Sequence, residues 1–72
     1  MTYTVIYEHG PEGWGAYVPD LPGVISVGDS KEEVEQLIRE AVAFHIEGLR
    51  DEGLPIPAPT CSAGVLTVDP AA

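Results

Sequence analysis

SKEEVEQLIREAVAFHIEGLRDEG, residues 30–53, carries the strongest local signal in this sequence. Ser30 precedes Glu33 by the spacing of a capping box. In that arrangement the serine hydroxyl accepts a hydrogen bond from the amide of Glu33, and the glutamate carboxylate accepts one from the amide of Ser30. Apolar side chains then recur at helical spacing, so one face of the helix should pack against a core. On this face we expect Val34, Leu37, Ile38, Ala41, Val42, Phe44, His45 and Leu49.

The end of this helix is equally well marked. We expect it to stop near Glu52, because Gly53 can adopt the left-handed conformation that closes many helices. Leu54 is then placed to contact Leu49, as in a Schellman motif, and Pro55 cannot continue the helix. The sequence therefore predicts one long amphipathic helix with defined ends.

Two segments before the helix alternate in the manner of strands. Residues 3–9 (YTVIYEH) and 14–18 (WGAYV) are rich in β-branched and aromatic side chains, and alternate residues point to opposite sides. The turn cluster GPEG at residues 10–13 lies between them, so they should form a hairpin. Gly15 lacks a side chain within the second strand, which indicates the close approach of another group, for example a neighbouring aromatic ring.

The remaining segments complete the expected fold. The prolines and glycine of residues 19–23 (PDLPG) take the chain out of the sheet, and residues 24–27 return as a short third strand. After the helix, alternating prolines make residues 55–59 stiff and extended, and residues 64–68 (GVLTV) are predicted to form a last strand. The order ββ(β)αβ predicts an α+β fold in which one helix packs on one face of a small, mainly antiparallel sheet. At this length we expect a single domain, residues 1–72.

The charge balance narrows the functions that this chain can have. Three Lys and Arg residues stand against twelve Asp and Glu residues, which gives a net charge of −9. Nucleic-acid binding requires cations that displace counterions from phosphates, so we expect no direct binding to DNA or RNA, and none to an anionic membrane. An acidic surface instead attracts and steers a basic protein partner. The alternative is that the acidity serves only solubility.

The cysteine content of the chain indicates its cellular compartment, and its length indicates whether it assembles into oligomers. Cys61 is the single cysteine, and one unpaired thiol fits the reducing cytoplasm. The first residues have neither the basic nor the apolar region of a signal peptide, and no apolar run is long enough to span a membrane. His9 and His45 are far apart and no second thiol is present, so we expect no metal and no cofactor. A chain this short has a marginal core, which predicts a homo-oligomer, most simply a dimer.

A known family shares several of these motifs. Residues 17–23, YVPDLPG, are similar to the signature loop of the HicB-like antitoxins of type II toxin–antitoxin systems. The resemblance extends to the hairpin turn at residues 8–13, the helix entry GDSKEE at residues 28–33 and the helix exit at residues 53–59. Together these motifs cover residues 3–59, which is most of the chain.

This resemblance implies a partial ribonuclease-H-like ββαβ fold and an antitoxin function. The partner that it implies is HicA, a small basic RNA-cleaving toxin with a double-stranded-RNA-binding fold. Many members of the family carry a DNA-binding domain after this module, whereas the present sequence ends before one could begin. We therefore do not expect transcriptional autoregulation by this chain alone. The alternative function is that of a solitary homo-oligomeric module, structural or small-ligand-binding, without a toxin.

A ribonuclease-H-like fold raises the question of catalysis. Two-metal hydrolysis needs several carboxylates that converge on a pair of ions, yet Val5, Ile6 and Tyr7 occupy the centre of the predicted first strand. His45 on the apolar helix face could act as a base or a pH switch. No nucleophile in a recognisable setting accompanies it, so a satisfied core or interface histidine is favoured. We expect no catalytic residue and no enzymatic activity.

The hairpin and the loop that follows it form the candidate partner-binding region. The candidate residues are Glu12, Trp14, Tyr17, Pro19, Asp20 and Leu21. Trp14 and Tyr17 would be the anchors that lose water in the complex, and Glu12 and Asp20 would be the flanking charges. Two of these residues have a structural alternative. Trp14 could belong to the core, and Asp20 could accept hydrogen bonds from the backbone of its own turn.

Overall fold

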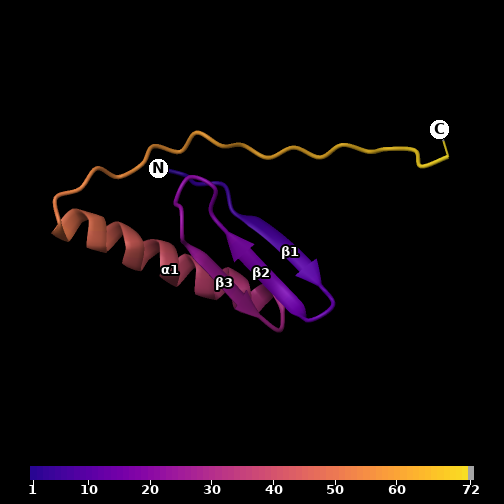
Figure 1. Cartoon of the computed structure of the whole chain (residues 1–72), viewed down its shortest axis with the longest axis horizontal. Coiled ribbons are helices and arrows are strands. Elements are labelled where there is room, and N and C mark those ends of the chain that lie inside the picture. Colours follow the sequence, from indigo (N-terminus) through magenta and orange to yellow (C-terminus); the bar gives the residue numbers. More distant parts are fainter. Residues whose placement is uncertain (72) are drawn as a thin grey trace.

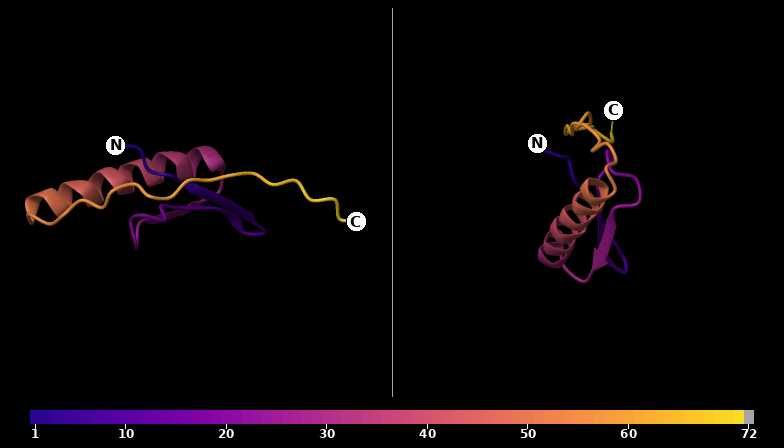
Figure 2. Two further views of the ribbon diagram at one scale, coloured as in Figure 1. Left: turned by 90° about the horizontal axis from the view of Figure 1, so that it is seen from above. Right: turned by 90° about the vertical axis from the view of Figure 1, so that its left-hand side faces the viewer.

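The computed structural model describes residues 1–71 as a small sheet, one helix and an extended C-terminal segment (Figure 1). The strands β1 (Ile6–Gly10), β2 (Gly13–Tyr17) and β3 (Ile25–Gly28) pair antiparallel in the order β1-β2-β3, and the helix α1 (Lys31–Asp51) follows them. Two further views show that α1 covers one face of the sheet (Figure 2). The predicted α+β fold, with one helix on one face of an antiparallel sheet, is confirmed.

The sheet is shorter at one end than the sequence predicts. Residues 3–5, which the sequence assigns to the first strand, lie outside the ladder, and β1 begins at Ile6 opposite Tyr17. The reason lies in the opposing strand. The amide of Val18 donates within the following loop, and Pro19 has no amide to offer. Residues 3–5 therefore lead into the sheet without a ladder partner.

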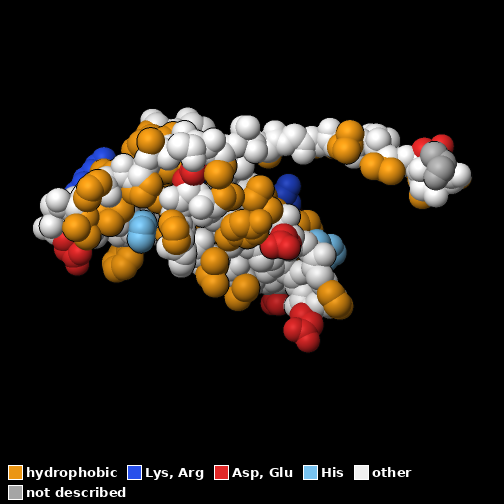
Figure 3. Space-filling model, turned by 45° about the horizontal axis from the view of Figure 1, so that its top comes forward, with side chains coloured by type: hydrophobic (Ala, Val, Ile, Leu, Met, Phe, Trp, Pro, Cys, Tyr) orange, Lys and Arg blue, Asp and Glu red, His pale blue; other side chains and the backbone are white. Residues whose placement is uncertain are grey.

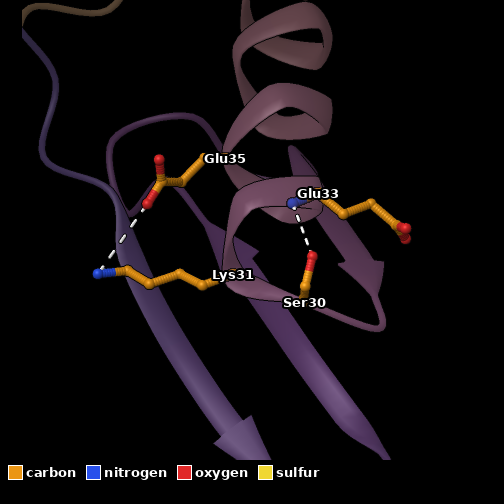
Figure 4. A network of polar contacts seen from close by, with 4 residues as sticks. All are labelled: Ser30, Lys31, Glu33 and Glu35. Carbon is orange, nitrogen blue, oxygen red and sulfur yellow. Dashed lines mark hydrogen bonds and ion pairs between the residues drawn. The ribbon is translucent and has the colours of Figure 1, made fainter.

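The capping box forms at the start of α1, with one change (Figure 4). The side-chain oxygen of Ser30 accepts a hydrogen bond from the Glu33 amide at 3.1 Å, as predicted. The Glu33 carboxylate accepts a hydrogen bond from the Asp29 amide at 3.3 Å, instead of from the Ser30 amide. Figure 4 also shows Lys31 and Glu35 paired at 4.0 Å. An exposed i,i+4 ion pair of this kind contributes only about 0.3–0.5 kcal/mol.

The C-terminus of α1 forms the predicted Schellman motif. Gly53 has a φ of +68°, and its amide donates to the Arg50 carbonyl at 3.1 Å. The amide of Leu54 donates to the Leu49 carbonyl at 2.9 Å. These two bonds satisfy carbonyls that the end of the helix leaves free. The chain then turns back toward the sheet (Figure 1).

The core lies between α1 and the face of the sheet that the helix covers. It consists of Ala16, Val18, Leu21, Val24, Val34 and Ile38. Half of this set comes from the loop between β2 and β3, where the Leu21 amide donates to the Val18 carbonyl at 3.0 Å and the Val24 amide to the Leu21 carbonyl at 3.1 Å. These two turns point the apolar side chains of the loop inward, so the loop closes one end of the core.

The predicted packed face of the helix is wrong at two positions, because Phe44 is 80% exposed and Leu37 is 38% exposed. The helix has 21 residues, and at 1.5 Å per residue it extends for about 31 Å. The strands have four or five residues and extend for about 17 Å at most. The C-terminal half of α1 therefore runs past the sheet, and there only a stripe of Ala41, Val42 and Ile46 packs against the core.

The predicted last strand, residues 64–68, is also wrong. This segment is extended, but it pairs with no strand of the described chain (Figure 1). Every described residue from position 58 onward is exposed. Alternating apolar residues predict an extended backbone, which is observed. They do not specify the backbone partner that a strand needs.

Candidate functional site

The sheet has one covered face and one uncovered face. Because side chains alternate along a strand, the residues in register with the buried Ala16 point toward α1, and their neighbours point away from it. We call the surface that points away the outer face. It comprises Ile6, Glu8, Gly15, Tyr17, Ile25 and Val27. Ile25 is 66% exposed and Val27 is 74% exposed, so two large apolar side chains of this face lie in water.

Gly15 leaves a depression at the centre of the outer face. It lies between Glu8 of β1 and Val27 of β3. A Cβ atom on Gly15 would meet only the carbonyl oxygen of Ser26 within 4 Å, at 3.7 Å, which is an ordinary van der Waals contact. The fold therefore does not require glycine here, and no aromatic ring of the described chain makes the predicted close approach. The space over Gly15 is open to a partner.

An open hollow with an acidic rim adjoins this depression. Its volume is about 770 Å³, and Gly15 and Val27 of the outer face are part of its lining. The lining also includes Glu8, Glu12 and Asp29, all of which are exposed. Three carboxylates around one depression create a negative potential that suits a Lys or Arg side chain of another protein. We call this feature the acidic hollow.

Three of the predicted partner-binding residues are accessible along this surface. Glu12 lines the acidic hollow. Tyr17, at the other end of β2, is 38% exposed on the outer face. Pro19 is exposed in the loop shortly after Tyr17. Glu12 and Tyr17 therefore stand at opposite ends of one surface, and Pro19 lies at its margin.

Trp14 belongs mainly to the other side of the sheet. Its ring stacks on that of His9, its partner across the hairpin, with ring centroids 4.3 Å apart and ring planes at 6°. It is half-buried and also packs against the core. Of its two alternatives, core packing is the one that these contacts support. Trp14 stiffens the hairpin from the inner side and also borders the acidic hollow.

Asp20 and Leu21 are used within the chain. Leu21 is 0% exposed, so its side chain fills the core and cannot contact a partner as predicted. The Asp20 carboxylate accepts hydrogen bonds from the Thr60 hydroxyl at 2.7 Å and from the amides of Thr60 and Cys61 at 3.1 Å each. The Thr60 hydroxyl, followed by the Cys61 amide, holds the pKa of Asp20 below its usual value of 3.8. Asp20 thus has a structural role, with donors from the C-terminal segment instead of its own turn.

From the sequence, Ile6, Ile25 and Val27 are predicted to lie in strands but not on a binding surface. A signal for them exists, because a single helix can cover only one face of a sheet, and alternate residues of each strand must then face outward. What the sequence does not reveal is which alternate set is inside. Ser26 is the polar member of β3, yet it points inward, where its hydroxyl donates to the Val34 carbonyl at 3.3 Å.

The structure also shows where the residues of the other candidate chemistries lie. Because β1 begins at Ile6, its central residue is Glu8 and not the apolar residue that the sequence predicts. Within residues 1–71, no group of three or more His, Cys, Asp or Glu side chains is placed to hold a metal ion. His45 is half-buried on α1, and Cys61 is exposed. No helix among the described residues has the apolar length needed to cross a bilayer.

Comparison with known proteins agrees with this architecture. A family profile described as the HicB-like antitoxin of bacterial toxin–antitoxin systems matches residues 3–70. Antitoxin HicB 2 of Photorhabdus laumondii is 28% identical over 99% of this chain and 51% of its own length. An uncharacterised 14.9 kDa protein of Haemophilus phage HP1 is 37% identical over 79% of this chain and 43% of its own length. The chain thus spans about half the length of these two relatives.

A solved structure gives the same result in three dimensions. One chain of a HicA3 and HicB3 toxin–antitoxin complex superimposes with a TM-score of 0.68 and 33% sequence identity, covering 83% of this chain and 70% of that chain. The arrangement of the sheet and the helix is therefore a shared fold. This chain belongs to the family of HicB-like antitoxins of bacterial toxin–antitoxin systems.

Proposed function

We propose that this chain is an antitoxin-like binding protein that neutralises a small, basic, HicA-like RNA-cleaving toxin by covering the toxin's RNA-binding or active surface. The observation that carries the proposal is the outer face, where exposed apolar side chains adjoin the acidic hollow. The related chain from a complex of HicA3 and HicB3 supports it. A protein that grips RNA presents basic groups to phosphates, and the same groups suit a surface lined by carboxylates.

The apolar and acidic parts of this surface have different tasks in the proposed complex. Complete burial of a Val or Ile side chain is worth about 1.5–3 kcal/mol, so Ile25 and Val27 can supply binding energy. The carboxylates of Glu8 and Glu12 steer the basic partner and raise the association rate. Steering alone does not give a tight complex, because association costs several kcal/mol, on the order of 4–15. The proposed contact residues are Ile6, Glu8, Glu12, Tyr17, Pro19, Ile25 and Val27.

We further propose that residues 1–72 act in the cytoplasm as one HicB-like unit that binds protein, not nucleic acid, and catalyses no reaction. The net charge of −9 supports the choice of partner. An exposed, unpaired Cys61 suits a reducing compartment. We also propose that the chain is homo-oligomeric, because its buried core is small for a stable monomer.

The direct test is co-expression with a small basic protein encoded beside this chain, followed by pull-down and by rescue of cell growth. Val27→Lys places a positive charge on the outer face and should weaken the complex by about 30-fold or more, equivalent to about 2 kcal/mol. Phe44→Lys is the matched control, because Phe44 is similarly exposed on α1, away from the outer face. Undiminished binding by Val27→Lys would contradict the site. Failure to capture or rescue with any such basic protein would contradict the antitoxin function.

A second candidate function is that of a solitary homo-oligomeric module without a toxin, structural or small-ligand-binding. The observation that favours it is the exposed apolar C-terminal segment, in which Val65 is 100% and Leu66 is 86% exposed. The two functions predict different results in the same experiment. A solitary module associates with itself, but it neither binds the adjacent basic protein nor rescues growth.

A further inference from the structure

The C-terminal segment has the chemistry of a strand but pairs with no strand among residues 1–71. Residues 64–68 read GVLTV, and Val65, Leu66 and Val68 are 100%, 86% and 70% exposed. No charged residue occurs in residues 54–68. Figure 3 shows the segment projecting from the body as an arm that carries apolar side chains. An extended, uncharged, β-branched segment in water is the kind of sequence that pairs with an open sheet edge.

The arm leaves the domain from a fixed point. The Asp20 carboxylate holds the Cys61 amide at 3.1 Å, and the Thr4 hydroxyl donates to the Cys61 carbonyl at 2.8 Å. The Tyr3 hydroxyl donates to the Pro57 carbonyl. The chain just before the arm is therefore anchored beside the residues that lead into β1. Beyond Cys61 it runs outward from the domain (Figure 1).

Strand β1 offers an open edge beside an apolar groove. It pairs with β2 on one side only, so the backbone groups on its other side have no strand partner. A groove of about 450 Å³ lies between this edge and α1. Its lining consists mainly of apolar and aromatic side chains, among them Tyr3, Val5, Tyr7, Ile38 and Val42, and its charged members are Glu35 and Arg39. A strand placed on the β1 edge would send alternate side chains toward this groove.

The other open edge, that of β3, lacks such a groove. The Ser26 hydroxyl donates directly to the Val34 carbonyl of α1 at 3.3 Å. The Glu33 side chain packs so closely on Gly28 that even a Cβ atom there would collide with its carboxylate. These contacts close the space between β3 and α1, so a strand added to β3 would have no place for its inward side chains.

We propose that residues 64–68 of one copy of this chain add as a strand to the free edge of β1 in a second copy, and that the exchange is reciprocal. Leu66 and Val68 lie on the same side of an extended segment, and they enter the groove between β1 and α1 of the second copy. A twofold arrangement covers both arms and both β1 edges at once. The exchange also enlarges two small cores, which is a common way for a short chain to become stable. It does not depend on toxin binding, because neither the arm nor the groove belongs to the outer face.

The geometry favours a second copy over the β1 edge of the same chain. Residues 61–69 are extended throughout, without a turn or bend. To reach its own β1, the arm would have to change direction directly after the anchor at Cys61. A second copy can accept the arm in the direction in which it already points.

Light scattering behind a sizing column, at micromolar protein, should give about twice the chain mass of 7.6 kDa for the full chain. Leu66→Asp puts a charge into the groove and should raise the dissociation constant of the dimer by about 30-fold or more. Thr67→Asp is the matched control, because the same charge one residue away points to the opposite side of the added strand. It should change the dissociation constant by less than about threefold. A monomeric full chain, or equal effects of the two variants, would overturn the proposal.

A mixing experiment separates exchange between copies from docking within one chain. Val42→Asp damages the groove and should give a monomer, whereas Ala43→Asp, at an exposed neighbouring position on α1, should not. When Leu66→Asp and Val42→Asp chains are mixed, the intact arm of the second fits the intact groove of the first. The mixture should therefore regain dimers, which also shows that both variants fold. The mixed dimer keeps one of the two exchanges, so its dimer fraction is compared with that of each variant alone. A mixture with no more dimer than either variant alone would exclude strand addition between copies.

Discussion

Leu21 and Val27 are apolar residues in the same small domain, but Leu21 is 0% exposed and Val27 is 74% exposed. Leu21 lies beneath the sheet, where the loop between β2 and β3 closes the core. Val27 lies on the outer face, one residue along β3 from Ser26, which points inward. Inward residues are constrained by packing, and outward residues are not. The packing of the fold therefore does not account for the large apolar side chains on the outer face. Binding of a protein partner accounts for them.

The largest effect is expected on the stability of the fold, for a substitution of the buried Leu21. Leu21→Ala should lower the free energy of unfolding by about 2–5 kcal/mol, because it leaves a cavity in a fully buried site. For a chain of this size the whole free energy of unfolding is only roughly 4–11 kcal/mol, so this substitution would remove a large part of the stability. Val27→Ala should change it by less than about 0.5 kcal/mol. Urea unfolding at one fixed protein concentration measures both, and similar losses for the two variants would refute the division between the faces.

The next largest effect is expected for a substitution on the outer face, which should weaken toxin binding without destabilising the fold. Gly15→Val fills the depression at the centre of the outer face, where the nearest atom to the new Cβ is the Ser26 carbonyl oxygen at 3.7 Å. Valine also favours strand geometry, so the unfolding midpoint should stay the same or rise. Toxin binding should weaken by about 30-fold, as for a hot-spot change of about 2 kcal/mol. Calorimetric titration of the toxin, with a thermal melt of each variant, distinguishes this from a general loss of structure.

A smaller effect is expected at the acidic rim of the same surface. Glu12→Lys should slow association with the toxin by up to about tenfold at low ionic strength, and the difference should shrink as salt screens the charges. The dissociation rate should hardly change, because Glu12 is exposed and makes no buried contact. Glu52→Lys, at the far end of α1, is the control of equal charge change. Stopped-flow measurements over a salt series would contradict this role of Glu12 if both variants behaved alike.

The parts of the fold that could be predicted from the sequence are those determined by residues close together in the chain. Ser30 and Gly53 mark the ends of α1 through bonds that involve only nearby residues. Both caps form, although the Glu33 carboxylate accepts its hydrogen bond from the Asp29 amide instead of from the predicted Ser30 amide. The hairpin between β1 and β2 is equally local. Antitoxin family membership was also accessible, because the loop and cap motifs stand at specific spacing in the sequence.

The remainder depends on distant contacts that a sequence pattern does not specify. Asp20 occurs in a turn, but its hydrogen-bond donors are Thr60 and Cys61, forty positions away and more. Leu21 sits between two residues that are outside the core, and only the folded loop shows that it is the buried one. Residues 64–68 have a strand pattern, but no strand in the described part of the chain pairs with them. In each case the residue types were informative, and the missing information was which other part of the molecule they meet.

The smallest expected effect concerns Asp20, the half-buried neighbour of the buried Leu21. Its pKa is held below 3.8 by the Thr60 hydroxyl and the Cys61 amide, which bond to the ionised carboxylate. A carboxyl group whose pKa is depressed in the folded state contributes stability above its unfolded value, and that contribution is lost as the pH falls through the lowered pKa. The anchor of the C-terminal arm should therefore persist at pH 4 and release only in more acidic solution. Among the described residues, the buried core around Leu21 contains no charged side chain. In an NMR titration the Cys61 amide resonance should move with a midpoint below 3.8, and Asp20→Asn should abolish that movement because it removes the titrating carboxyl. A midpoint at or above the usual aspartate value would show that these bonds do not hold the arm in solution, and the fixed departure point of the arm beside β1 would then be lost.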